Sequence, residues 1–180
     1  MANLKFADMH NLEIVLADPP AVHSDMRSMI HRFRECCLAS AITINPVVYQ
    51  CLIREFWETV ETNMDDYGDF TVKAKVQDRE IVIDEGFIRE ALLIDDQPNF
   101  PTEIGIEDVQ RVLRRMSYEG TLPPTLKKLL HPYWRFLGHV FVSCILGRRA
   151  RADEISQRRT GALVSLAAGF RFNFSKFIFE

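Results

Sequence analysis

Basic side chains gather in the last part of the chain, close to Phe170 and Phe172. Guanidinium groups bind phosphate and aromatic rings stack on bases, so this combination is typical of a surface that holds a nucleic-acid backbone. Asp153 and Glu154 interrupt the run, however, and arginines at a helix end also suit the helix dipole. Nucleic-acid binding is therefore one of three hypotheses for this sequence, beside a structural or interaction module and an enzyme of unfamiliar type, which would need a concave pocket with convergent polar groups. Its candidate residues are Arg148, Arg149, Arg151, Arg158, Arg159, Arg171 and Lys176.

Two pairs of adjacent aspartates, Asp65-Asp66 and Asp95-Asp96, are the acids that could hold catalytic metal ions. Two-metal chemistry needs several carboxylates that converge from rigid elements. Neighbouring aspartates in polar loops point apart and usually accept hydrogen bonds from nearby backbone. We therefore predict turn and helix-capping roles for both pairs.

His131, His139 and Cys144 are the other residues that could bind a metal. They lack the spacing of a zinc site and a fourth donor, so His139 is predicted to be a hydrogen-bonded histidine at the edge of the core. Walker, dinucleotide-binding, nucleophile-elbow and zinc-knuckle motifs are all absent from the sequence. The sequence therefore predicts a non-enzymatic chain with no catalytic residue, cofactor or metal ligand.

Composition favours one intracellular domain, either cytoplasmic or nuclear. The chain has 180 residues, 47% of them hydrophobic, which is enough for a substantial core. Its most apolar stretch, 133–146, is shorter than the ~20 residues of a membrane span, and we expect no membrane partner. The four cysteines form no C-x-x-C pair and are expected to be reduced. Residues 1–90 carry nine basic and 16 acidic side chains and residues 91–180 carry 13 and nine, an asymmetry that can orient a partner.

In the first part of the chain, residues 1–23 are expected to be loosely structured, and 24–180 to form a single domain. Asn45-Pro46 is a strong helix-start signal, because Asn caps orphan N–H groups and Pro suits the first helical position. The apolar stripe of the following helix includes Trp57. If this stripe is core, Trp57→Ala should cost ~3–5 kcal/mol.

From residue 70 the hydrophobic period changes from helical to alternating. The pattern predicts a β-hairpin at about 70–83, preceded by a polar loop over 63–69. Asp84 is placed to cap the short helix that follows.

The second half predicts further helices, one from Ile106 to Met116 and two at about 132–147 and 153–168, the last ended by Gly169. The tail 170–179 is strongly aromatic and would expose apolar area unless something covers it, which suggests a longer parent chain. The expected fold is mainly α, a bundle-like single domain of about six to seven helices with one small hairpin.

Five groups of residues, spread over nearly the whole chain, form one pattern of fixed order and spacing. The groups are Phe6-Ala7-Asp8 with His10-Asn11, Asn45-Pro46 with Tyr49 and Phe56-Trp57, Ile88-Arg89 with Leu92 and Asp95-Asp96, Trp134-Arg135-Phe136-Leu137 with His139 and Cys144, and Gly169 with Phe172-Asn173-Phe174-Ser175-Lys176 and Ile178-Phe179. Together they resemble a family of plant LTR-retrotransposon-associated reading frames, described as putative transposon proteins. One departure is Ala152-Asp153 before Glu154-Ile155-Ser156, where the family has a Trp-Asn pair.

The resemblance implies the N-terminal, non-enzymatic part of a retroelement polyprotein, in a family that continues past the Asn173–Lys176 segment. The favoured hypothesis is a structural or interaction module of this origin, with self-association or polyprotein partners. The alternative is a nucleic-acid-binding accessory that uses the Arg148–Arg159 region.

Overall fold

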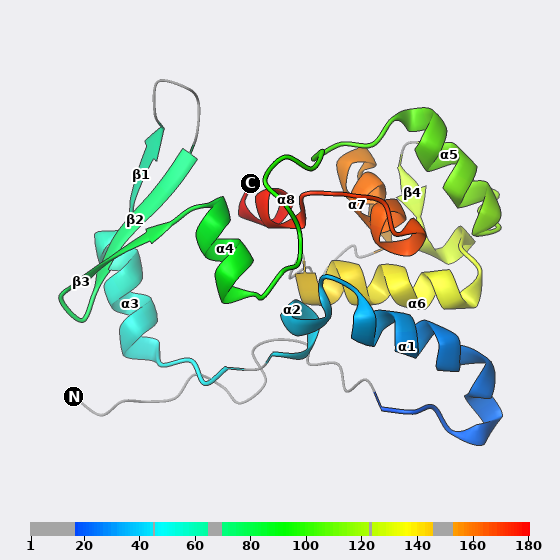
Figure 1. Cartoon of the computed structure of the whole chain (residues 1–180), viewed down its shortest axis with the longest axis horizontal. Coiled ribbons are helices and arrows are strands. Elements are labelled where there is room, and N and C mark those ends of the chain that lie inside the picture. Colours follow the sequence, from blue (N-terminus) through cyan, green and yellow to red (C-terminus); the bar gives the residue numbers. More distant parts are fainter. Residues whose placement is uncertain (1–16, 45, 65–69, 123, 146–152) are drawn as a thin grey trace.

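The structure of the chain is a computed structural model, which describes residues 17–44, 46–64, 70–122, 124–145 and 153–180. These residues form a mainly helical fold with two small antiparallel sheets (Figure 1). No helix in the described ranges is long and apolar enough to cross a membrane. The elements are η1 (Ala21–Met26), α1 (Arg27–Glu35), α2 (Ala39–Thr43), α3 (Gln50–Thr59), β1 (Glu61–Met64), β2 (Phe70–Val76), β3 (Arg79–Ile83), α4 (Glu85–Ala91), α5 (Ile106–Arg115), β4 (Thr125–Leu126), η2 (Lys127–Leu129), α6 (Pro132–Val140), the π-helical turn η3 (Phe141–Ile145), β5 (Glu154–Ile155), α7 (Gln157–Ala168) and α8 (Phe174–Phe179).

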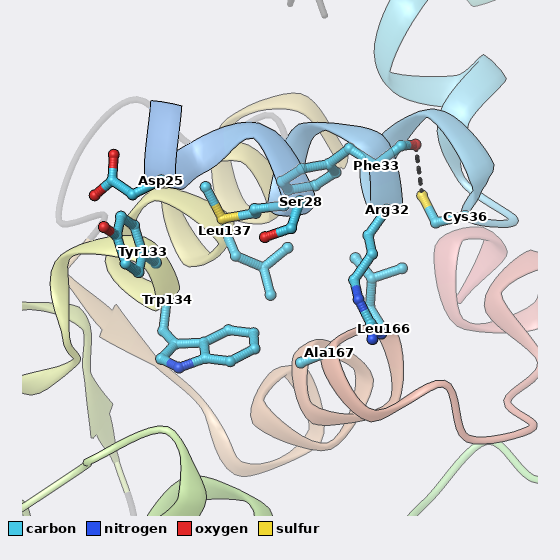
Figure 2. Close-up of a pocket in the computed structure, with 11 residues that line it drawn as sticks. Asp25, Ser28, Arg32, Phe33, Cys36, Tyr133, Trp134, Leu137, Leu166 and Ala167 are labelled. Carbon is cyan, nitrogen blue, oxygen red and sulfur yellow. Dashed lines mark hydrogen bonds between the residues drawn. The ribbon is translucent and has the colours of Figure 1, made fainter. Parts of the chain in front are cut away.

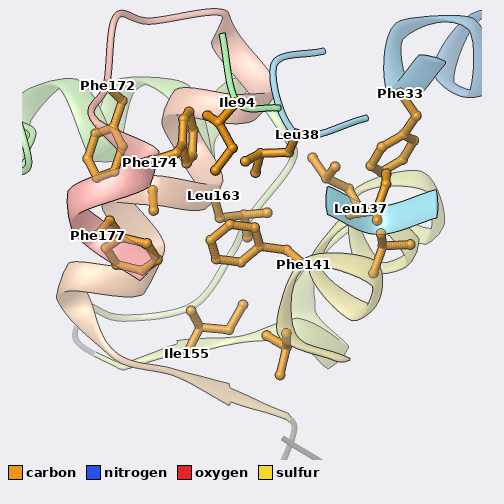
Figure 3. Close-up of a cluster of buried hydrophobic side chains, with 14 residues drawn as sticks. Phe33, Leu38, Ile94, Leu137, Phe141, Ile155, Leu163, Phe172, Phe174 and Phe177 are labelled. Atoms are coloured by element: carbon orange, nitrogen blue, oxygen red, sulfur yellow. The ribbon is translucent and has the colours of Figure 1, made fainter. Parts of the chain in front are cut away.

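Helix α7 is the centre of the helical body. Its residues 160–165 are all buried, because α5 and α6 pack against it. Leu163 belongs to the larger buried cluster, together with Phe141 of η3 and Leu38 (Figure 3). Val164 belongs to a second cluster that is formed mainly by α5. Gly169 ends α7 as predicted, in a left-handed conformation with φ of 70° that suits glycine.

The aromatic tail is covered by other elements of the described chain. Phe172, Phe174 and Phe177 are each 6% exposed or less and form part of the larger cluster. The rings of Phe177 and Phe141 stack at 6.1 Å between centroids. Figure 3 shows the three tail rings gathered on one side of the cluster. The tail is covered because the chain reverses after Gly169 and lays α8 against α4.

A buried polar network holds α8 in place. Asp96 is 4% exposed, and its carboxylate accepts hydrogen bonds from the backbone N–H of Ser175 at 2.7 Å and from Nε of Arg89 at 2.6 Å. The side chain of Asn173 caps α8 and donates to Glu85 at 2.9 Å. Asp96 thus serves a helix N-terminus, as predicted for the loop aspartates, although that helix lies 79 residues further along the chain.

Helix α3 starts later than predicted. Its first residue is Gln50, and the residue before it, Tyr49, is extended, with φ of −107° and ψ of 131°. Asn45, the predicted cap, lies outside the described residues, and Pro46 precedes the helix by four positions. This segment stays out of the helix because Tyr49 is extended and the β-branched side chains of Val47 and Val48 favour extended backbone.

The predicted hairpin is confirmed as β2 and β3, paired from Val72–Ile83 to Val76–Arg79. The predicted loop before it is partly wrong, because residues 61–64 form β1 and pair with β2 in a three-stranded sheet. Asp84 caps α4 as predicted, accepting from the N–H of Phe87 at 2.7 Å. The helix predicted from residue 153 begins at Gln157, because Glu154 and Ile155 form a second sheet with β4.

Helix α3 and the three-stranded sheet form a separate layer at one side of the molecule (Figure 1). Of the described residues between 46 and 83, only Ala74 is among the buried hydrophobics, and none joins either core cluster. Trp57 is 68% exposed. The prediction that its stripe is core is therefore wrong at this residue, because nothing in the described residues covers the outer side of α3.

Candidate functional site

A pocket of about 450 Å³ opens between α1, α6 and α7. It is called the Trp134 pocket below. Its floor and walls are apolar and its rim is polar (Figure 2). The lining residues are Asp25, Ser28, Met29, Arg32, Phe33, Cys36, Tyr133, Trp134, Leu137, Leu166 and Ala167.

The pocket follows from the pattern of α1 and the turn before it. Positions 25, 28, 29, 32, 33 and 36 are spaced by three or four and therefore share one helical side. Phe33 is 3% exposed and anchors that side in the core. Ser28 and Arg32 remain exposed at the edge. Helix α1 thus buries Phe33 in the core, while Ser28 and Arg32 on the same side of the helix line the opening of the pocket.

Arg32 is the charged group of the pocket that is best placed to meet a ligand. Figure 2 shows its side chain reaching from α1 toward Leu166. Among the residues that the structure describes, the side chain of Arg32 makes no hydrogen bond or ion pair. The side chain of Asp25, at the other end of the rim, makes none either. An unpaired guanidinium beside an apolar hollow favours a ligand that carries both an apolar group and a negative charge.

The thiols near the pocket are unsuited to nucleophilic chemistry. Cys36 donates to the carbonyl of Phe33 at 3.2 Å, and burial raises the pKa of its thiol. Burial, with a further contribution from Cys36, raises the pKa of the Cys37 thiol to about 12. Because the thiolate is the reactive form, both groups are poor nucleophiles near neutral pH.

A second hollow, of about 340 Å³, is also lined by Trp134. It shares Trp134 and Ala167 with the first, and its remaining lining includes Phe170 and two arginines of α5. Arg111 pairs with Asp108, whereas Arg115 has no ion pair within the described ranges. Trp134 therefore borders two hollows that each carry an arginine without an ion pair among the described residues.

The residues that the sequence proposed for nucleic acid are only partly described. Arg148, Arg149 and Arg151 lie outside the described residues. Arg158 pairs with Glu180 and lies 5.2 Å from the ring centre of Phe177.

The other members of that set are spread over the C-terminal part of the fold. Arg171 lies 5.7 Å from the ring centre of Phe100. Arg159 is half-buried on α7, and Lys176 donates its backbone N–H to the cap of α8. The described members thus contact several separate elements, and nucleic-acid binding stays a prediction.

The histidines and cysteine considered for metal binding do not form a cluster. Ser143 lies 3.4 Å from Nδ1 of His139, which is exposed, and the ring of His131 lies 5.0 Å from that of Tyr133. Within the described part of the chain, no group of three or more His, Cys, Asp or Glu side chains could hold a metal ion.

The sequence does not predict the Trp134 pocket. It predicts a helix at about 132–147, and Trp134 of that segment packs against both clusters. The amphipathic side of α1 with Arg32 on it was the available signal. Helical spacing alone does not tell a covered side chain from one that borders an opening.

Comparison of the chain with family models, with curated proteins and with solved structures gives no match. Its fold and its candidate site are therefore described from its own geometry, and the resemblance to retrotransposon-associated reading frames stays a prediction.

Proposed function

We propose that this chain is a non-enzymatic interaction module that receives an apolar side chain of a protein partner in the Trp134 pocket. The observation that carries the proposal is the pocket itself, an apolar hollow of about 450 Å³ with the unpaired Arg32 at its edge. Protein contacts concentrate their energy in a few aromatic or arginine anchors that fill such hollows.

The use of ionisable groups supports binding rather than catalysis. Glu85, Arg89 and Asp96 direct their hydrogen bonds to one another and to α8. Asp25 and Arg32 are the charged residues that line the pocket, and both lie on its rim. The other ionisable groups of the lining are Tyr133 and the Cys36 thiol, whose pKa is raised by burial. Acid–base chemistry needs a donor and an acceptor that converge on one reacting atom, and the lining of this pocket is mainly apolar.

The proposal includes the origin that the sequence resemblance implies, an intracellular structural module of a plant retroelement polyprotein. This part rests on sequence segments such as Trp134–Leu137 and Phe172–Lys176. Remnants of a polymerase or integrase gene beside the coding sequence would support it, and an ordinary gene neighbourhood with no such remnants would count against it.

Binding of an apolar anion tests the pocket directly. The test uses the Trp57→Ser variant, which lacks the exposed tryptophan and keeps Trp134 in the pocket. We expect anilinonaphthalene sulfonate to bind this variant at one site. A second substitution in the same variant, Ser28→Phe at the pocket mouth, should weaken dye binding at least ~10-fold, because the phenyl ring occupies the hollow. Glu90→Phe, on the exposed side of α4, is the matched control and should leave binding unchanged. Equal dye fluorescence in all three variants would contradict the proposal.

A further inference from the structure

Helix α3 carries an exposed side that nothing in the described residues covers. Its members are spaced by one, three or four positions, so they share one side of the helix, and all are exposed. Trp57 is 68% exposed. This surface, the α3 face, consists of Gln50, Arg54, Trp57 and Glu58.

The opposite side of α3 is fixed to the sheet. The hydroxyl of Thr59 accepts from the backbone N–H of Lys75 at 2.8 Å, and the carboxylate of Glu55 accepts from the N–H of Gln77 at 2.8 Å. These bonds set the rotation of the helix about its axis. Trp57 is therefore held outward by the fold and does not reach the surface by fraying of a helix end.

We propose that the α3 face of one copy docks on the Trp134 pocket of a second copy, with the indole of Trp57 entering the hollow between α1, α6 and α7. This inference rests on the proposed function, because it names the occupant of the same pocket. Trp is the residue most enriched among the anchors of protein interfaces. The exposed indole of Trp57 and the apolar lining of the pocket are chemically complementary, and both belong to the same chain.

Charge complementarity supports a second copy as the occupant. Glu58, which follows Trp57 on the α3 face, has no ion pair among the described residues. Arg32, at the pocket edge, has none there either. Docking would bring the carboxylate of Glu58 to the arginine side of the pocket, where desolvation strengthens the pair.

The opposite charges of the two surfaces are also complementary. Arg54 of the α3 face and Asp25 of the pocket rim both lack an ion pair within the described part of the chain. The α3 face thus offers one cation, Arg54, and one anion, Glu58, and the rim of the pocket offers an anion at one end and a cation at the other. Such a pattern specifies the direction in which the helix would lie.

The size of the pocket fits the inference. At about 450 Å³ it lies within the range of roughly 300–1,000 Å³ that is typical of ligand pockets. Its walls include the rings of Phe33 and Trp134, which can contact an incoming indole edge to face. The guanidinium of Arg32 can lie over the same indole.

The positions of the two surfaces determine the type of assembly. In Figure 1, α3 lies at the left of the molecule, whereas α1, α6 and α7 lie at its right. A contact between different surfaces is head-to-tail, so it forms rings or open chains, and an open chain leaves a free pocket at one end and a free α3 face at the other. A twofold dimer with Trp57 against Trp57 is not expected.

Sedimentation of the full chain over a concentration series tests the inference with two blocked variants. Trp57→Ser removes the anchor and Ser28→Phe fills the pocket, and both positions are exposed, so the melting temperature should be unchanged. The wild type should form concentration-dependent oligomers. Each variant alone should associate about 30-fold or more weakly, which is the scale of an interface hot spot. Glu90→Phe is the control and should associate as the wild type does.

An equal mixture of the two blocked variants gives the decisive readout. Trp57→Ser keeps its pocket and Ser28→Phe keeps its anchor, so the mixture should form a heterodimer and nothing larger. Charge exchange gives a second readout: Arg32→Glu should weaken the contact, and a partner with Glu58→Arg should restore it.

Three results would overturn the inference: a wild type that stays monomeric at every concentration, variants that associate as the wild type does, or a mixture that forms no heterodimer. If any of these occurs while the dye still binds in the Trp134 pocket, the proposed function stands and another protein is the occupant. If dye binding is also absent, the proposed function fails as well.

Discussion

The helical body and the layer of α3 with the three-stranded sheet both contain helices with apolar side chains but differ in what covers them. In the body, α7 is covered by its neighbours and its residues 160–165 are all buried. In the layer, α3 contains no buried residue, and Ala74 is the one buried hydrophobic side chain among the described residues of 46–83. A helical stripe therefore indicates which side of a helix is apolar, but not whether the same chain covers it.

The difference has a physical reason. Helix α3 is ten residues long and packs with one side on β2, the strand with which it makes most of its contacts. A single small sheet can cover only one side of a helix. Helix α7, in contrast, lies between α5 and α6, with the tail segment and its three buried rings beside it.

Loss of a core ring in the body should have the largest effect. Phe141 is 1% exposed and touches the tail through Phe177, so Phe141→Ala should lower the free energy of unfolding by ~3–5 kcal/mol. Phe87 is the matched control, since it is 41% exposed, and Phe87→Ala should cost less than ~1 kcal/mol. Urea unfolding measures both. Equal losses for the two variants would mean that the body is no better packed than its surface.

Removal of the buried carboxylate of the body should have the next largest effect. Asp96→Ala leaves the half-buried Arg89 without this partner and the N–H of Ser175 unsatisfied, so it should cost about 3 kcal/mol. The exposed neighbour provides the control, and Asp95→Ala should stay within ~0.5 kcal/mol of the wild type. Thermal unfolding of the two variants separates them. A small change for Asp96→Ala would show that α8 is held by its aromatic rings alone.

Local signals predicted the elements whose stability is set within a few residues. The cap of α4 by Asp84, the end of α7 at Gly169 and the hairpin over 70–83 each depend on short-range chemistry. The apolar positions of α5 also follow the expected spacing, with Val109, Val112 and Leu113 buried. The mainly helical class followed from the same patterns.

The features that the sequence did not predict depend on distant partners. Strand β1 exists because β2 pairs with it, and its own residues, Glu61 to Met64, carry no alternating apolar pattern. The tail is buried because Asp96 and Arg89 bind its N-terminal turn from 79 or more residues away. The Trp134 pocket is a gap between three helices, and its place depends on how they pack rather than on any one segment.

The most direct test of the difference between the body and the layer is a substitution at Trp57, for which we expect the smallest change in the free energy of unfolding. Trp57→Ala, measured by urea unfolding at a concentration where the chain is monomeric, should alter the free energy of unfolding by less than ~0.5 kcal/mol, because the side chain is 68% exposed. A loss of ~3 kcal/mol or more, the size expected for a buried tryptophan, would contradict the account. The α3 face would then be part of the core and unavailable to a partner.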